Sequence, residues 1–222
     1  MYANAAPYRS SVVRRLVRLY AGLVLYGASS ALLVVAGLGL EPWGVLHQGI
    51  SELTGIAIGT VSIGVGALVL LLWIPLRQRP GLGTVSNVFV VGLVIDGTLA
   101  VVPEAHGWAA RTAVLVLGVV LNGAATGLYI TARFGPGPRD GLMTGLHRAT
   151  GRSVRLARTA VEVAVVAAGF ALGGSLGIGT LVYALAIGPL AQFFLRLFAI
   201  PGAPGATGAV AGPSPVTAIL RR

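Results

Sequence analysis

Long apolar runs separated by short polar stretches make up most of this chain. Runs of about 20 residues with few internal charges have the length needed to cross the hydrocarbon core of a bilayer as an α-helix. Six runs fit this description, at residues 16–36, 55–76, 85–102, 112–132, 154–172 and 178–198. The pattern therefore predicts an all-α, polytopic membrane protein with six transmembrane helices.

Two segments that are too short to span a bilayer, 42–54 and 138–150, follow the first and the fourth run. Each begins with a proline, which is favoured in the first turn of a helix because its missing N–H would have had no partner there. A Thr-Gly pair at the end of each segment predicts the helix terminus. Such a short helix either lies in the membrane interface or is re-entrant, dipping into the bundle with its N-terminal amides open to an anion.

The second half of the chain repeats the first half at a constant offset of 96 residues. About 23 of the 88 residue pairs between 15–102 and 111–198 are identical without a gap, against roughly nine expected from the composition. The shared positions include the glycines and prolines that separate the segments. We infer a duplication into repeat 1 (15–102) and repeat 2 (111–198), with a lead at 1–14 and a tail at 201–222.

Three spans in each repeat make the two repeats cross the membrane in opposite senses. Arginines gather at alternate connections, beginning with the N-terminal lead, and the connections between them are acidic, balanced or uncharged. The positive-inside rule then places both termini in the cytoplasm. We predict a 3+3 inverted-topology repeat and a disordered cytoplasmic tail at 201–222, which is rich in Pro, Gly and Ala.

The net charge of +10 does not point to nucleic acid. The chain has no lysine, and nearly all its arginines lie at the ends of apolar runs, which is the pattern of membrane orientation. Arg without Lys, beside abundant Ala and Gly, is typical of a GC-rich bacterial genome, so we expect the bacterial cytoplasmic membrane. With no Cys there is no disulfide, thiolate nucleophile or Cys-ligated metal, and neither a cofactor nor a metal site is predicted.

Charges within or beside the spans are the candidates for a ligand or ion site, because a charge near mid-membrane is costly without a partner. Arg158 and Glu162 form an i, i+4 pair, which either fixes helix register or belongs to such a site. Asp96 has no basic residue within a turn of its own helix, so it faces the bundle or becomes neutral, with Arg158 as a conceivable partner. Arg139 and Asp140, at the start of the second short helix, complete the candidate set.

Three more arginines, Arg148, Arg152 and Arg155, belong to the same basic connection. We expect them to contact anionic lipid headgroups or a cytoplasmic protein, because clustered arginines beside a membrane bind anionic partners.

Several motifs together resemble those of the YczE family of bacterial integral membrane proteins, over about residues 15–198. The motifs lie at residues 42–47, 54–55, 72–84, 135–143, 150–152, 177–180 and 187–189. The resemblance implies a membrane location and supplies neither a substrate nor catalytic residues. Gly44 departs from the polar residues common at this place in the family, which weakens the case for a role of the first copy of the motif.

Two classes of function are compatible with these features. A transporter or channel for a small solute or ion is favoured, because inverted repeats with interrupted helices allow two related states that open to opposite sides. The alternative is a non-transporting scaffold that binds lipid or protein through its arginines. A lipid-modifying enzyme ranks third, because no set of acid, base and nucleophile supports it.

Overall fold

The structure, a computed structural model, describes residues 12–199 as eight α-helices. In chain order these are α1 (Val12–Ala36), α2 (Pro42–Thr54), α3 (Ile58–Leu72), α4 (Leu82–Val101), α5 (Trp108–Thr131), α6 (Pro138–Thr150), α7 (Val154–Ala171) and α8 (Ile178–Leu197). The described range contains no strand, so the all-α class is confirmed. The predicted tail and most of the predicted lead lie outside this range.

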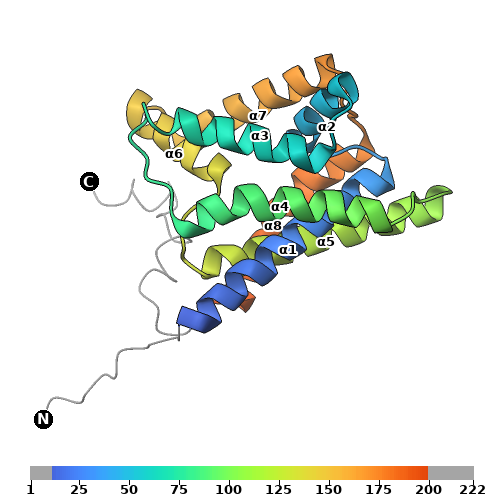
Figure 1. The fold of residues 1–222 in the computed structure, drawn as a ribbon, viewed down its shortest axis with the longest axis horizontal. Coiled ribbons are helices and arrows are strands. Elements are labelled where there is room, and N and C mark those ends of the chain that lie inside the picture. Colours follow the sequence, from blue (N-terminus) through green and yellow to red (C-terminus); the bar gives the residue numbers. More distant parts are fainter. Residues whose placement is uncertain (1–11, 200–222) are drawn as a thin grey trace, which may run out of the picture.

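The helices form two groups, one above the other (Figure 1). The long helices α1, α4, α5 and α8 make one group, in which α1 packs on both α4 and α5, and α5 packs on α8. The short helices α2 and α6 lie in the other group with α3 and α7. Within that group α2 packs on α7 and α6 packs on α3, so each short helix contacts a helix of the other repeat.

Four helices are long and apolar enough to cross a membrane: α1, α4, α5 and α8. A fifth crossing is possible if α2 and α3 together form one broken span, since the chain turns by 116° between them. Helix α3 alone has 15 residues, about 22 Å, which is shorter than a hydrocarbon core of about 30 Å. Helix α7 has 18 residues but carries three charged side chains. The count of six spans stays a prediction.

Both short helices begin and end where the sequence predicted. They start at Pro42 and Pro138, and each is closed by a glycine in the left-handed region, Gly55 at φ 71° and Gly151 at φ 67°. A left-handed C-terminal residue favours glycine, because a side chain there is strained. The bounds of α2 and α6 differ by 96 residues at both ends, and so do those of α4 and α8.

Arginines at the starts of α1 and α5 bind each other's helix ends. The Nε of Arg15 donates to the carbonyl oxygen of Ala132 at 3.1 Å, and the Nε of Arg111 donates to that of Ala36 at 2.7 Å. A cation at a helix C-terminus satisfies orphan carbonyls and interacts favourably with the helix dipole. Because the start of each helix meets the end of the other, α1 and α5 run antiparallel.

A second exchanged pair joins the loops to the starts of α4 and α8. The N–H of Gly83 donates to Phe134 O, and the N–H of Gly179 donates to Leu38 O, both at 2.8 Å. Gly179 lies 96 residues after Gly83, and Phe134 lies 96 residues after Leu38. The two bonds are therefore the same contact with the roles of the two repeats exchanged. Exchange of this kind, where i meets j and j meets i, is the signature of a two-fold relation.

Candidate ligand site between the repeats

The starts of the two short helices border one cavity of about 530 Å³. All eight helices contribute to its lining, which includes residues 42–43 of α2 and residues 138–140 of α6. Positive ends of two helix dipoles therefore border the same space. The size lies within the range of sites that enclose small molecules.

Equivalent residues of the two short helices touch in this cavity. Trp43 and Arg139 are both the second residue of their helix, 96 positions apart. The guanidinium of Arg139 lies 5.0 Å from the centre of the Trp43 ring, a cation–π contact. The two repeats thus meet face to face at this point, through residues of different chemistry.

Each short helix also carries one carboxylate at its start, but from a different position. In α2 it is Glu41, the residue before the helix, and its Oε2 lies 2.8 Å from where a Cβ on Gly44 would be. In α6 it is Asp140, the counterpart of Gly44, and its Oδ2 lies 3.3 Å from where a Cβ on Gly137 would be. Acid and glycine have therefore changed places between the repeats.

Three polar groups of the cavity have unused hydrogen-bonding capacity. Oε2 of Glu41 and Nε1 of Trp43 are buried, in side chains that are 4% and 5% exposed, and neither has a hydrogen-bond partner in the described protein. The guanidinium of Arg139 contacts the Trp43 ring and forms no ion pair or hydrogen bond within residues 12–199. Buried polar groups are costly without partners, so this combination points to a ligand.

Tyrosines surround these charges. The hydroxyl of Tyr129 donates to Oδ2 of Asp140 at 3.2 Å, and the Tyr129 ring meets Tyr26 edge to face at 6.1 Å. On the other side, the hydroxyl of Tyr183 donates to Oδ1 of the fully buried Asn122 at 2.9 Å. These bonds fix the tyrosines in the walls of the cavity, beside the unpartnered groups.

Four of the five candidate ligand residues line this cavity: Arg139, Asp140, Arg158 and Glu162. Arg158 and Glu162 form the predicted i, i+4 ion pair, with 3.0 Å between Nε and Oε1. Their side chains are 58% and 33% exposed, so they stand at the rim, whereas Glu41 lies deep inside.

Asp96, which the sequence grouped with these charges, is bound elsewhere. Its carboxylate accepts hydrogen bonds from the N–H of Gly59 at 2.6 Å and from the hydroxyl of Thr60 at 2.9 Å. These donors belong to the first turn of α3, where free N–H groups and the helix dipole favour an anion. Asp96 therefore holds α3 against α4 instead of facing Arg158.

The three arginines expected to contact lipid or protein are all exposed. Arg148 donates to Oε1 of Gln78 at 3.5 Å, and the carbonyl of Arg152 contacts Nδ1 of His147. The side chains of Arg152 and Arg155 form no ion pair with a carboxylate of the described range.

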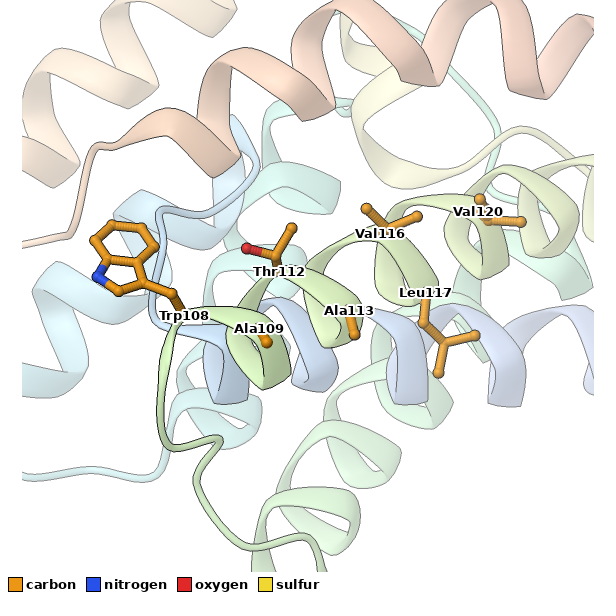
Figure 2. A pocket seen from close by; sticks show the side chains of 7 residues that line it. All are labelled: Trp108, Ala109, Thr112, Ala113, Val116, Leu117 and Val120. Atoms are coloured by element: carbon orange, nitrogen blue, oxygen red, sulfur yellow. The ribbon is translucent and has the colours of Figure 1, made fainter.

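A second hollow, on the outer face of α5, has a different character. Figure 2 shows its seven lining side chains along one helix: Trp108, Ala109, Thr112, Ala113, Val116, Leu117 and Val120. It contains no charged group, and its one aromatic side chain lies at the helix start, where a membrane interface favours tryptophan. Such a surface suits lipid chains and carries no chemical site.

An all-helical fold with several apolar helices of spanning length defines an integral membrane protein of the α-helical class. A family model described as a family of unknown function, DUF6198, matches residues 13–196, and the chain belongs to this family.

Named relatives agree with this assignment. An uncharacterized protein of Haemophilus influenzae is 39% identical over 177 residues, covering 80% of this chain and 81% of the relative. The uncharacterized membrane protein YczE of Bacillus subtilis is 31% identical over 189 residues, covering 84% and 88%. The resemblance to the YczE family is therefore confirmed. No solved structure matches the chain.

Glu41, Trp43 and the tyrosines are site residues that sequence reasoning missed. In the sequence Glu41 is simply one of the acids of a connection without arginines, and Gly44 weakens the case for the first copy of the motif. A signal was present: at an offset of 96, Glu41 and Gly44 align with Gly137 and Asp140. The acid comes first in one copy and the glycine comes first in the other, three residues apart. This exchange indicates that both helix starts carry a carboxylate.

Proposed function

We propose that this protein is a transporter of a small solute or ion in the bacterial cytoplasmic membrane, with its site in the cavity between the repeats. The observation that carries the proposal is the convergence of both short-helix starts on one cavity that holds unpartnered polar groups. Helix starts that face a shared internal site are typical of transporters built from inverted repeats.

The exchanged contacts support the inverted arrangement that this function needs. Antiparallel α1 and α5, joined by the bonds of Arg15 and Arg111, favour repeats that enter the membrane in opposite senses. Because both ends carry equivalent contacts, a conformation that opens one end has a counterpart that opens the other. A site placed between the repeats is then accessible from each side in turn.

Flux through proteoliposomes tests the proposal. The purified full-length protein is reconstituted, and uptake is measured for small anions, amino acids and other metabolites. We expect at least one solute to move. Arg139→Gln is expected to abolish that flux, because it removes the lining cation that forms no ion pair, whereas the matched control Arg152→Gln, outside the cavity, leaves it intact.

The contrary results are equally clear. Movement of no solute by protein that is correctly inserted overturns the transport function. Full flux in correctly inserted Arg139→Gln protein removes the cavity as the transport site.

The exposed arginines favour a second candidate function, the binding of anionic lipid. Arg152 and Arg155 have exposed side chains without a carboxylate partner in residues 12–199, which suits phosphate headgroups. Native mass spectrometry in mixed lipid is expected to retain phosphatidylglycerol on the wild type. The variant Arg148→Gln/Arg152→Gln/Arg155→Gln is expected to lose it, and equal retention by both proteins contradicts this candidate.

A further inference from the structure

We propose that the cavity binds a small organic zwitterion, with its carboxylate on the Arg139–Trp43 side and its ammonium group on Glu41. This inference rests on the proposed function and names its substrate class.

The groups without a hydrogen-bond partner include two donors and one acceptor. A guanidinium and an indole N–H donate hydrogen bonds and accept none, so Arg139 and Trp43 require an acceptor such as a carboxylate. A bound ammonium group favours the ionised form of the buried Glu41, and an ionised carboxylate only accepts hydrogen bonds, so the two groups suit each other. These three groups line the same cavity, and a ligand carrying both functions satisfies all of them.

The charge balance favours a ligand that is neutral overall. With Glu41 ionised beside the bound ammonium group, Glu41, Asp140 and Arg139 together carry one negative charge in the lining of the cavity. Two helix starts border the cavity, each equivalent to roughly half a positive charge, and they offset it. The rim pair of Arg158 and Glu162 is neutral by itself. A simple anion or a simple cation would disturb this balance in a poorly hydrated site, and a zwitterion would not.

The two carboxylates have different surroundings, which gives the ligand a direction. Asp140 already accepts a hydrogen bond from the Tyr129 hydroxyl at 3.2 Å, whereas Oε2 of Glu41 has no partner in the described protein. The ammonium group therefore gains most at Glu41. The ligand's carboxylate is then left to the free donors on Arg139 and Trp43.

Binding to the purified full-length protein in detergent tests the substrate class. Isothermal titration is carried out with the twenty common amino acids, and then with the amine and the acid analogue of each binder. For leucine these analogues are 3-methylbutylamine and 4-methylpentanoate. We expect at least one amino acid to bind, and both of its analogues to bind about tenfold more weakly or worse, because each leaves a charged group without its partner.

Variants assign the two ends of the ligand. Glu41→Gln is expected to weaken the amino acid about tenfold and to leave the acid analogue unchanged, whereas Arg139→Gln weakens both. Gly64→Ala is the matched control, because a Cβ at Gly64 meets nothing within 4 Å. Unchanged melting temperatures separate loss of binding from loss of fold.

Three results overturn the zwitterion: an acid analogue that binds as tightly as its amino acid, an amine that does so, or no amino acid that binds at all. Failure of this inference is distinguishable from failure of transport. Flux of another solute without amino-acid binding would support the transport function and overturn the zwitterion as substrate. Amino-acid binding without flux would support the binding site and overturn the transport function.

Discussion

The two short helices, α2 and α6, share a backbone plan but differ in the side chains they bring to the cavity. Both start with proline and end at a left-handed glycine, 96 residues apart. Yet α2 contributes a tryptophan and a carboxylate from the position before the helix, whereas α6 contributes an arginine and a carboxylate from inside its first turn. The two helices thus share a backbone frame and differ in their chemistry.

Because of this difference, two helices with the same backbone plan border an asymmetric site. Two identical helix starts would present the same groups twice and suit a symmetric ligand. Here the Trp43 ring contacts the Arg139 guanidinium at equivalent positions of the two helices. Asp140 accepts a hydrogen bond, whereas Oε2 of Glu41 has no partner in the described protein. A ligand with distinct ends matches such a site.

The contacts that pack α2 and α6 against their neighbouring helices also differ between the repeats. The Trp73 ring lies over Gly141 of α6, 2.0 Å from where a Cβ would stand, and its Nε1 donates to Pro138 O at 3.1 Å. At the equivalent contact, Gly169 of α7 packs directly on the backbone of α2, where a Cβ would lie 2.5 Å from Leu46 N. Large and small side chains have been exchanged between the two contacts.

The largest expected effect comes from filling these two close contacts. Gly169→Ala and Gly141→Ala are expected to cost between about 2 and 3 kcal/mol in the free energy of unfolding, toward the upper end of overpacking. Gly169→Ala should cost more, because it meets backbone while Gly141→Ala meets a side chain.

Unfolding of the purified protein by denaturing detergent, followed by circular dichroism, measures both costs. The control Gly64→Ala, at an open position of α3, is expected to be neutral or slightly stabilising. Equal stability of all three variants would contradict the packing difference.

The second prediction moves the carboxylate of α2 to the place it has in α6. Glu41→Gly is expected to weaken amino-acid binding between tenfold and a hundredfold, because the ammonium group loses its charged partner. Adding Gly44→Asp restores an acid at the same helix start and is expected to recover at least tenfold of that loss. If Glu41→Gly binds as the wild type does, the carboxylate at this helix start has no role.

The third prediction compares the arginine contacts at the two ends of the α1–α5 pair. Arg15→Gln and Arg111→Gln each remove the hydrogen bonds of a guanidinium to the end of the opposite helix, and each is expected to cost about 1–2 kcal/mol. The hydrogen bonds are equivalent, but Arg15 also lies 4.7 Å from the centre of the Phe134 ring, so Arg15→Gln should cost about 0.5–1 kcal/mol more than Arg111→Gln. The same unfolding measurement checks this, and a cost at one end only would show that the hydrogen bonds differ in strength.

Much of this architecture could be predicted from the sequence because it depends on local signals. Prolines and glycines set the bounds of α2 and α6, and the i, i+4 spacing predicted the pair of Arg158 and Glu162. The site itself depends on contacts between segments that are far apart. Nothing local places Trp43 beside Arg139, and Asp96 looked unpartnered only because its donors lie on the preceding helix.

The length of α3 shows another limit of pattern reading. Apolar residues extend beyond both ends of this helix, so the predicted run covered 55–76 while the helix has 15 residues. Hydropathy records which residues avoid water and not where the backbone turns. The 116° bend between α2 and α3 therefore left no hydropathy signal.

The central claim, that two oppositely oriented repeats enclose one site, is tested most directly by the side of the membrane on which equivalent residues lie. Glu52 of α2 and Arg148 of α6 are 96 residues apart and both exposed, and the chain has no cysteine of its own. Single variants Glu52→Cys and Arg148→Cys are treated with an impermeant maleimide in vesicles of known orientation. We predict labelling of Glu52→Cys from outside and of Arg148→Cys from the cytoplasmic side, and labelling of both from the same side would contradict the inverted arrangement.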